Sequence, residues 1–428
     1  MIAVANLIRY EQKHIDFLES AYLPHIATIS LMQDDVYCEP EVSLGDYVQE
    51  GQVIAKNSAK NAYIHSSIPG KIIAFQKESM PNGKKEKAVL IQLEGAFTYL
   101  GKTRLNTQWL VIPTSQRIKS LYKASVLNTF DAPQMLASQI EKLQNKKTNT
   151  LALRLFNADP SIASDLFISQ QYTEEILEGA SLLADSINAK SVFVLYADAN
   201  FIAPNDILIK KLFRHIDVYF IPVKTQYYPQ GTLHDISENV EHYMTKELKK
   251  NTVKISLAID AIAAFDTYRA IVQNIPLIER IIHVSGNAFA RDTILKVKIG
   301  TPIQTILEEV GGFIQKPAKI IVNGLIKGRA ISNIQSPIMS DTKSITVLST
   351  KNFPDQTQSP CIRCGRCHQI CPVLIQPEKI FQHRILHFPL SDDAIESSKL
   401  CTECGLCNMV CPSRLPLYQT ISLLKEEL

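Results

Sequence analysis

Short alternating segments dominate the first hundred residues of the chain, and longer periodic segments dominate its middle. In residues 42–55, and again in residues 62–75, apolar and polar side chains alternate, with glycines at the turns. A period of two residues is typical of half-buried β-strands, because successive side chains point to opposite faces. The sequence therefore predicts two β-hairpins within residues 31–104, after an N-terminal segment, 1–30, of mixed character.

Two hairpins of this kind resemble the lipoyl-type hammerhead, a barrel-sandwich hybrid. Lys56 and Lys60 are the candidates for carrying a swinging prosthetic group. Neither lysine lies between the acidic and small residues that mark lipoyl attachment. We therefore interpret residues 31–104 as a structural or docking module.

Apolar runs alternate with helical patterns in residues 105–250. The runs 151–156 and 191–196 are strand-like, and residues 174–187 between them repeat apolar side chains at the helical period. A second helical pattern, 207–216, leads into the apolar run 218–221. This order of strand, helix and strand is typical of an α/β domain with a parallel sheet.

A nucleotide-binding sheet normally has a glycine-rich turn between a strand and a helix N-terminus. Glycine is needed there because a Cβ atom blocks the close approach of phosphate to the backbone. Residues 124–137, where such a turn is expected, contain no glycine. The sequence offers no phosphate cradle at this place.

Residues 251–350 contain a strand that leads through Thr301-Pro302 into a helix, which Gly311-Gly312 ends. Residues 319–324 follow as the next strand and turn. This pattern looks like a small β-grasp module of the SLBB type. The Pro, Gln and Asp residues of 352–359 predict a linker into the last domain, 351–428.

The last domain contains one cysteine pattern written twice, C-x2-C-x2-C-x3-C-P, from Cys361 to Pro372 and from Cys401 to Pro412. This spacing is typical of ferredoxins with two [4Fe–4S] clusters, in which the fourth thiolate of each run binds the other cluster. The ligands predicted for the first cluster are Cys361, Cys364, Cys367 and Cys411. The ligands predicted for the second cluster are Cys401, Cys404, Cys407 and Cys371.

Zinc and disulfides are the alternative uses of these cysteines. A structural zinc ion takes four ligands, so two runs of four cysteines, each closed by proline, exceed its demand. Disulfide frameworks are typical of small secreted chains, whereas this chain has 428 residues and no signal-peptide pattern. Eight thiols kept for metal favour a reducing compartment, the cytoplasm. The ninth cysteine, Cys38, is expected to be a buried apolar residue.

Charge and hydropathy exclude two further classes of function. The formal net charge is +3, which does not indicate nucleic-acid binding. No apolar run approaches the roughly 20 residues that a membrane span needs, and the apolar segment 256–265 is interrupted by Asp260. We expect a protein that is soluble or that docks on a membrane through partner proteins.

The order of hammerhead, α/β domain, β-grasp module and helical two-cluster domain resembles the C subunit of the Rnf electron-transport complex (RnfC). The matching segments are 45–70, 228–231, 278–312 and 361–413. The resemblance implies a peripheral subunit on the cytoplasmic face of the inner membrane. It also implies a complex that exchanges electrons between NADH and a ferredoxin-like carrier while moving ions, with the other membrane redox subunits as partners.

The middle domain of this family is also similar to the flavin-carrying subunit of respiratory complex I, in which a glycine-rich loop binds FMN and NADH. This chain departs from that loop in residues 124–137. The family's next motif survives in shortened form as residues 157–160, so Asn157 and Asp159 are the only residues carried over as candidates for FMN binding. The sequence predicts two [4Fe–4S] clusters, a weak or empty FMN and NADH pocket, and no catalytic residue of its own.

Three alternatives stay open from the sequence. In the first, FMN and NADH bind through contacts that need no glycine, and the chain is a true NADH dehydrogenase subunit. In the second, the chain is a non-catalytic ferredoxin-like adaptor or scaffold with structural clusters. In the third, it is a soluble cobalamin reductase of the same domain order.

Overall fold

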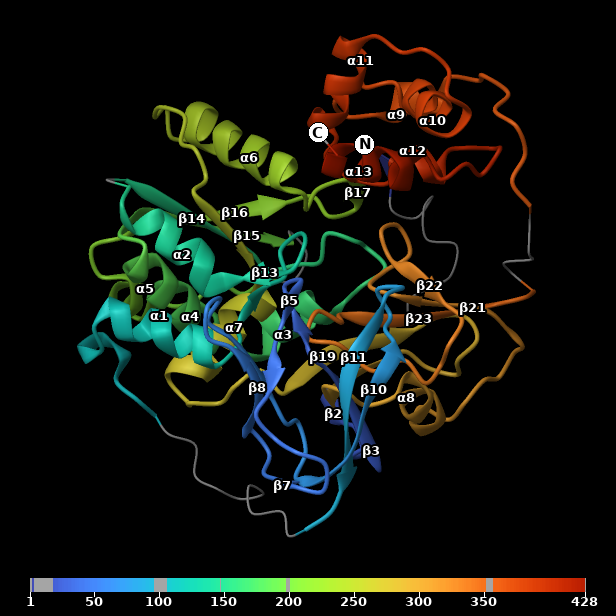
Figure 1. Cartoon of the computed structure of the whole chain (residues 1–428). Coiled ribbons are helices and arrows are strands. Elements are labelled where there is room, and N and C mark those ends of the chain that lie inside the picture. Colours follow the sequence, from blue (N-terminus) through green and yellow to red (C-terminus); the bar gives the residue numbers. More distant parts are fainter. Residues whose placement is uncertain are drawn as a thin grey trace.

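The computed structural model describes residues 2–3, 18–95, 106–146, 148–197, 201–351 and 357–427. In Figure 1 the strands of residues 26–93 lie toward the bottom, a parallel sheet with its helices to the left, a mixed sheet to the right, and the cysteine-rich helices at the top. Residues 4–17 of the predicted N-terminal segment and 352–356 of the predicted linker lie outside the described residues.

The predicted hairpins of the first domain form two antiparallel sheets that pack around one core. The first sheet has the order β3 (Ile26–Ser30), β11 (Lys85–Leu93), β10 (Gly70–Ser79), β7 (Tyr47–Val48). The second has the order β6 (Glu39–Pro40), β8 (Val53–Asn57), β9 (Ala62–His65), and β4 (Met32–Gln33) pairs with β5 (Val36–Tyr37). Ile54, Ile72 and Ile91 fill the core together with Cys38, which is buried as expected. Lys56 forms an ion pair with Glu41, and Lys60 is exposed.

The middle of the chain forms the parallel sheet that the sequence predicts. Its order is β16 (Asp217–Val223), β15 (Ala189–Ala197), β14 (Asn149–Arg154), β18 (Leu257–Asp260). The helices of this region are α1 (Thr114–Lys123), α2 (Leu136–Gln144), α3 (Ser164–Gln171), α4 (Thr173–Ser186), α5 (Asp206–Phe213), α6 (Leu233–His242) and α7 (Ala261–Ile271). The short strands β12 (Leu127–Asn128) and β13 (Gln134–Met135) pair before α2, and β1 (Ile2–Ala3) pairs with β17 (Tyr227–Tyr228). Apolar residues of β14, β15, α4 and α7 form the largest core.

Two strands, β18 and β2, pair with strands of a different predicted domain from their own. β18 and α7 follow residue 250, yet β18 pairs with β14 and extends the parallel sheet. β2 (Leu18–Ser20), from the predicted N-terminal segment, pairs with a strand of the mixed sheet. The reason is that a hydrophobic pattern identifies a strand but does not identify its partner strand when the two are far apart in the chain.

The mixed sheet has the order β2, β20 (Thr293–Lys298), β19 (Glu279–Ser285), β23 (Ser344–Ser349), β21 (Pro317–Val322), β22 (Arg329–Ile331). β19 and β20 form an antiparallel hairpin, and β23 runs parallel to β19 in the centre. Helix α8 (Ile303–Glu309) follows Pro302 and packs Ile303 and Ile306 against Ile282 and Val347 of the sheet. Gly311 and Gly312, both at positive φ, end this helix where the sequence predicts its end.

The cysteine-rich region repeats one arrangement of a loop, a short helix and a longer helix. The first repeat contains α9 (Arg366–Ile370) and α10 (Pro377–Leu386), and the second contains α12 (Leu406–Met409) and α13 (Leu417–Glu427). Helix α11 (Asp392–Glu396) and a 3-10 turn (Ser397–Leu400) connect them. Ile380 of α10 packs against Ile421 of α13. Among the described residues no helix has the length and apolar character needed to cross a membrane.

Two histidines buried between the domains make the stability of the fold depend on pH. His65 is 8% exposed and His283 is 1% exposed, and burial lowers the pKa of each to about 4. The unfolded chain binds protons at these sites as the pH falls below about 6.5, whereas the folded chain does not bind them until about pH 4. Full stability is therefore expected above about pH 6.5, with a loss of about 3 kcal/mol per histidine on acidification to about pH 4.

Urea unfolding, followed by the fluorescence of the buried Trp109 from neutral to acidic pH, measures this effect. His283→Gln should flatten the pH dependence of the free energy of unfolding. His215→Gln, at an exposed histidine, serves as the control and should leave it unchanged. An unchanged pH dependence in both variants contradicts the role given to His283.

Candidate metal centres and the edge of the parallel sheet

The four cysteines predicted for the second cluster line one cavity, whose empty space is about 320 Å³ when its opening to solvent is included. Cys401, Cys404 and Cys407 come from the second repeat, and Cys371 enters from the end of α9 in the first repeat. Val373, Ile375, Leu406 and Ile421 supply apolar walls to this cavity. The fold thus brings together a set of four thiols that neither repeat contains by itself.

The loop that carries these thiols packs against the turn between β21 and β22 of the mixed sheet. Gly405 has φ +74°, and a Cβ atom built on it lies 2.8 Å from Cγ2 of Ile326. Tyr228, which is 3% exposed, donates a hydrogen bond from its hydroxyl to the carbonyl oxygen of Cys404. Tyr228, Ile326, Cys404 and Leu406 form one apolar cluster. The loop around the second cavity is therefore held from outside the cysteine-rich region.

Three of the cysteines predicted for the first cluster also lie together. Cys361, Cys367 and Cys411 share one apolar group with Phe381, Leu415 and Leu417, next to Cys407. The Cys367 thiol donates to Oε2 of Glu378 at 3.1 Å, and Cys364 is exposed. The structure thus brings three of these four residues into one group and places Cys364 at the surface.

The donor set fits an iron–sulfur cluster better than a single metal ion. Within the described ranges no three His, Cys, Asp or Glu side chains converge closely enough to hold one ion. A four-iron cube, by contrast, separates its thiolates, so ligands spread around a cavity are what such a cluster requires. Burial raises the pKa of the Cys401 thiol to about 11 and that of the Cys407 thiol further, so these thiols need a bound cation to be ionised near neutral pH.

Other charged residues of these loops have partners of their own. Lys425 donates to the carbonyl oxygen of Cys401 at 3.0 Å and pairs with Glu403 at 2.7 Å. Nδ1 of His368 lies 2.9 Å from the carbonyl oxygen of Ile375, which makes His368 a packing residue. Lys425 therefore places a hydrogen-bond donor beside the second cavity, and Glu403 balances its charge.

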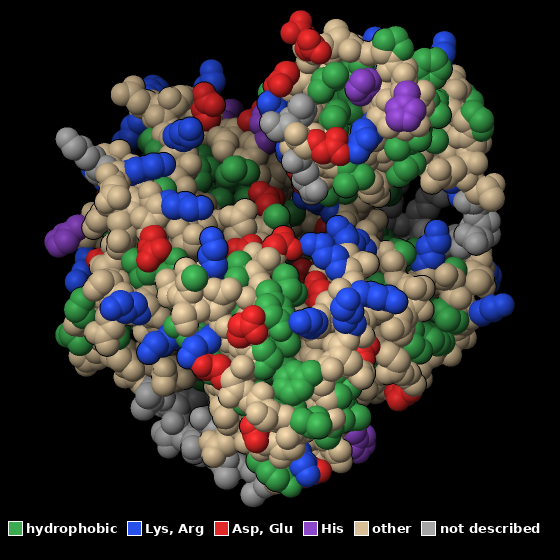
Figure 2. All heavy atoms as spheres, viewed as in Figure 1, with side chains coloured by type: hydrophobic (Ala, Val, Ile, Leu, Met, Phe, Trp, Pro, Cys, Tyr) green, Lys and Arg blue, Asp and Glu red, His purple; other side chains and the backbone are tan. Residues whose placement is uncertain are grey.

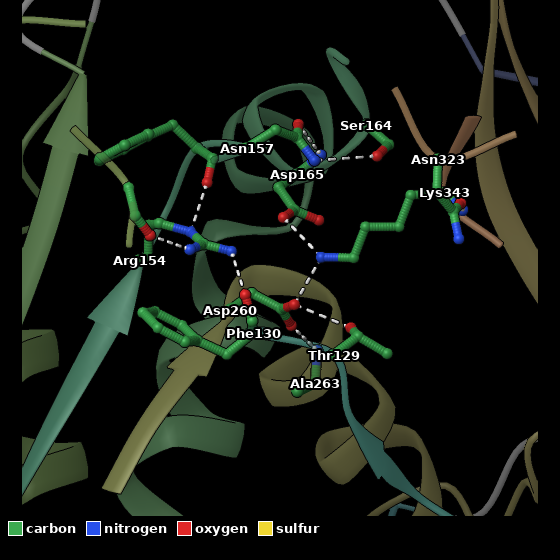
Figure 3. Close-up of polar contacts among 12 residues, drawn as sticks. Thr129, Phe130, Arg154, Asn157, Ser164, Asp165, Asp260, Ala263, Asn323 and Lys343 are labelled. Carbon is green, nitrogen blue, oxygen red and sulfur yellow. Dashed lines mark hydrogen bonds and ion pairs between the residues drawn. The ribbon is translucent and has the colours of Figure 1, made fainter. Parts of the chain in front are cut away.

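The carboxyl edge of the parallel sheet, where such sheets bind ligands, is filled by side chains (Figure 3). Arg154, at the end of β14, is 1% exposed and donates to the carbonyl oxygens of Phe156 at 2.9 Å and Phe130 at 3.0 Å, and also to that of Gly231. Its guanidinium lies 4.1 Å from the centre of the Phe130 ring. This arginine was not among the candidates from the sequence, although a charge inside the apolar run 151–156 was a signal of buried pairing.

Lys343 closes the same edge from the mixed sheet. Its ammonium lies 2.5 Å from Asp260 and 3.1 Å from Asp165, and both carboxylates are fully buried. Burial by itself raises the pKa of a carboxyl group, but Lys343 and Arg154 lower the pKa of Asp260 to about 2. For Asp165 burial prevails, and its pKa is raised. Lys343 lies in a polar stretch, and nothing in the sequence pattern marked it.

Asn157 and Asp159, the two candidates for FMN binding, bond to their own chain. Oδ1 of Asn157 accepts from the backbone N–H of Asp165 at 2.9 Å. Asp159 accepts from the N–H groups of Ile326 at 2.8 Å and Ser161 at 2.9 Å, and Gly324 leaves room for it because a Cβ there lies 2.3 Å from Oδ2. These contacts use the polar atoms that a flavin would need. The residues at this edge do not fit a flavin nucleotide.

Replacing Lys343 should be costly because two buried carboxylates lose the one cation that is bonded to both of them. We expect Lys343→Met to lower the free energy of unfolding by about 3–5 kcal/mol. The triple variant Lys343→Met, Asp165→Asn, Asp260→Asn should recover part of this loss. Lys319→Met, at an exposed lysine of β21, is the control. Urea unfolding measures the stability of the single variant, the triple variant and the control. A Lys343→Met variant that is as stable as the control contradicts the ion pairs of Lys343 with Asp165 and Asp260.

Known proteins match this chain in two regions and over most of its length. Residues 11–96 match the RnfC barrel sandwich hybrid domain, and residues 357–415 match the 4Fe-4S dicluster domain. The α/β region lies outside both of these matches. The barrel-sandwich domain and the iron–sulfur domain expected from the sequence are both confirmed by these matches.

Several relatives are C subunits of redox complexes. The C subunit of the proton-translocating ferredoxin:NAD(+) oxidoreductase complex of Clostridium ljungdahlii is 28% identical over 350 residues, 80% of this chain and 74% of the relative. The C subunit of the ion-translocating oxidoreductase complex of Rhodobacter capsulatus is 26% identical over 84% of this chain and 70% of the relative. The C subunit of the Na(+)-translocating ferredoxin:NAD(+) oxidoreductase complex of Acetobacterium woodii is 24% identical over 81% of this chain and 78% of the relative.

Among solved structures, an NAD+-reducing [NiFe]-hydrogenase in the air-oxidized state matches with a TM-score of 0.47 and 11% identity, covering 78% of this chain and 67% of the other. This likeness is too loose to bear on function. The RnfC domain at the N-terminus and the similarity over four fifths of the sequence confirm the resemblance to RnfC, and the chain is a relative of the C subunits of ion-translocating oxidoreductase complexes.

Proposed function

We propose that this chain is the peripheral electron-transfer subunit of an Rnf-type ion-translocating complex that moves electrons between ferredoxin and NAD. It carries electrons through two [4Fe–4S] clusters and holds no flavin of its own. The observation that carries the proposal is the cavity in which Cys371 of one repeat meets Cys401, Cys404 and Cys407 of the other. The relatives named above, which are subunits of complexes of this kind, support the same assignment.

Within this proposal, Cys361, Cys364, Cys367 and Cys411 hold the first cluster, and Cys371, Cys401, Cys404 and Cys407 hold the second. A [4Fe–4S] cluster supplies one-electron chemistry. Burial of the cluster disfavours the negative charge that reduction adds. Hydrogen-bond donors or cations near the sulfurs favour that charge. The apolar walls of the second cavity act in the first direction, whereas Lys425 and the Tyr228 hydroxyl act in the second.

Side chains fill the carboxyl edge of the parallel sheet, which favours a path in which electrons enter this chain through the clusters. Arg154, Lys343 and Asp159 lie at the carboxyl edge of the sheet, where sheets of this class commonly bind ligands, and each is bonded within the chain. Other subunits of the complex then exchange electrons with NAD. The chain itself docks on the cytoplasmic face of the membrane through those subunits, its partners together with a ferredoxin-like carrier.

The proposal predicts about eight iron atoms per chain and little flavin in anaerobically purified protein. Iron analysis and the visible absorption spectrum measure both. Stoichiometric FMN that NADH bleaches overturns the flavin-free assignment. Zinc in place of iron overturns the cluster assignment.

The crossed ligand sets can be separated with pairs of substitutions. Cys371→Ser with Cys401→Ser removes two ligands from one cluster and should leave about four iron atoms, whereas Cys371→Ser with Cys361→Ser damages both clusters and should leave few. If each repeat holds its own cluster, the two results are exchanged. Cys38→Ser, in the hammerhead core, is the control and should keep the full iron content.

Tyr228→Phe removes the hydroxyl that donates to the Cys404 carbonyl and keeps the ring. Because this donor stabilises added negative charge near the second cluster, its loss should lower the reduction potential of that cluster. The first cluster should be unaffected. Tyr227→Phe, at the more exposed neighbouring tyrosine, is the matched control. A redox titration followed by EPR measures both potentials, and equal potentials in the two variants contradict the role of Tyr228.

A further inference from the structure

The hairpin of β10 and β11 continues past the core of the hammerhead, and one of its edges is open. In the sheet, β10 lies between β11 and β7, but β7 pairs only with Gly70 and Lys71. Beyond that short pairing, β10 runs on to Ser79 with β11 along one side. Among the described residues no strand pairs with the other side of residues 75–79, so this stretch is an edge strand.

The register of the sheet shows which backbone groups point to the open side. The N–H of Leu31 donates to the carbonyl oxygen of Lys87 at 2.8 Å, so Lys87 directs its backbone groups toward β3. Lys87 lies opposite Lys77, and this pair therefore exchanges no hydrogen bonds, with the N–H and C=O of Lys77 pointing outward. Phe75 and Ser79 share this direction because the pattern repeats every second residue. In the part of the chain that the structure describes, these outward groups have no backbone partner.

Three lysines lie on one face of this hairpin. Lys77 and Lys87 are opposite each other, and Lys85 lies two residues from Lys87 on the same face. All three are exposed, and within the described ranges none of them forms an ion pair. The ammonium of Lys87 lies 5.0 Å from the centre of the Tyr37 ring. Figure 2 shows basic side chains gathered over the end of this hairpin, below the lobe of cysteine-rich helices.

The opposed lysines have no counter-charge on their own face. Asp35, which lies nearby, pairs with Lys84 at 2.7 Å. Glu78 and Glu86 are opposite each other on the other face of the hairpin, because side chains alternate along a strand. Like charges directly opposite each other destabilise a sheet, and the side chains of a pair without hydrogen bonds lie closest. An anionic partner that covers this face therefore removes an unfavourable interaction.

Contacts at the tip hold the hairpin in position. Arg329 of β22 donates to the carbonyl oxygen of Asn82 in the turn. The side chain of Asn82 donates to Oε1 of Glu86 at 2.7 Å. The open edge is thus anchored to the mixed sheet as well as to the hammerhead. A rigid edge loses little conformational entropy when another strand is added to it.

The open edge and the lysine face together indicate one class of partner. Lipid head groups can meet the lysines, but they make no use of backbone groups that point outward in register. A second copy of this chain can pair edge to edge, but the pairing brings the Lys77 side chains of the two copies together. Lysine on an edge strand also protects against aggregation, a role that does not account for Lys85 and Lys87 on the neighbouring strand. An extended peptide with acidic side chains at alternate positions fits both features.

We propose that the outer edge of β10, residues 75–79, binds an extended acidic segment of a partner protein, which adds one strand to the sheet. The backbone of the segment bonds to the outward N–H and C=O groups of Phe75, Lys77 and Ser79. Its acidic side chains, at every second position, lie on the face of Lys77, Lys85 and Lys87. This binding does not depend on the iron–sulfur clusters.

The test uses the full chain and a fluorescein-labelled peptide in which glutamate alternates with valine. Fluorescence anisotropy should show binding that weakens as salt screens the charges. Lys77→Glu with Lys87→Glu should lower the affinity about tenfold at low salt. Lys210→Glu with Lys211→Glu makes the same charge change on exposed lysines of α5 and should leave the affinity unchanged. A peptide of equal composition with its glutamates in one block should bind more weakly, because its charges do not share one face.

Backbone pairing is tested separately from charge. Ser79→Pro removes one outward N–H and keeps the bonds between β10 and β11, so it should weaken peptide binding at high salt as well as at low salt. Adding the peptide to the unmodified chain should slow the hydrogen exchange of the amides in residues 75–79. Urea unfolding of each variant shows whether it folds, and the exchange experiment needs no variant.

Equal affinity in the two lysine variants, or equal binding of the alternating and block peptides, contradicts the proposal. Peptide binding without slower exchange in residues 75–79 means attraction without strand addition and also contradicts it. Slow exchange of these residues in a dimer of this chain, without peptide, assigns the edge to a second copy. Absence of peptide binding, together with binding to anionic lipid vesicles that Lys77→Glu with Lys87→Glu abolishes, assigns the lysines to a membrane surface and overturns the inference.

Discussion

The ammonium of Lys343 between two buried carboxylates is the interaction on which the arrangement of the domains depends. Asp165 and Asp260 are fully buried at the edge of the parallel sheet, and a pair of carboxylates in that position is strongly unfavourable without a cation. The cation comes from the mixed sheet. The ion pairs therefore fasten the two sheets together at the same time as they close the edge.

The same lysine connects this edge to the second metal centre. The backbone N–H of Lys343 donates to Oδ1 of Asn323 at 2.7 Å, and the turn that follows Asn323 bonds to Asp159 through Ile326. The side chain of Ile326 packs against Gly405 in the cysteine loop. A rigid path of contacts thus runs from the sheet edge to the loop whose thiols line the second cavity. The α/β region acts here as a support for the metal centre.

The sequence predicted those parts of the molecule that local patterns define. The hammerhead strands, the order of strands and helices in the parallel sheet, and the ends of α8 follow from side-chain period and from glycine and proline. The crossed thiol set was predicted from the cysteine spacing, which encodes the geometry of the loop. Asp260 and Arg154 were visible as charges inside apolar runs, but their partners were not.

What the sequence did not predict are contacts between segments far apart in the chain. Lys343 meets Asp165 and Asp260, and Tyr228 meets Cys404, across separations that no local pattern records. For the same reason β18 was assigned to the wrong side of a boundary, since its apolar residues fit either sheet. Partner choice over such distances is decided by the packing of whole sheets.

The missing glycines of residues 124–137 and the closed edge of the parallel sheet bear on the same question, namely what can bind at that edge. Without glycines in 124–137 the backbone cannot approach a phosphate closely. At the edge of the sheet, Asp165 and Asp260 face the positive charge of Lys343, and these ion pairs are buried. A scaffold closed in this way keeps its shape whether or not a nucleotide is present, which is a suitable property for a support that holds a metal centre in position.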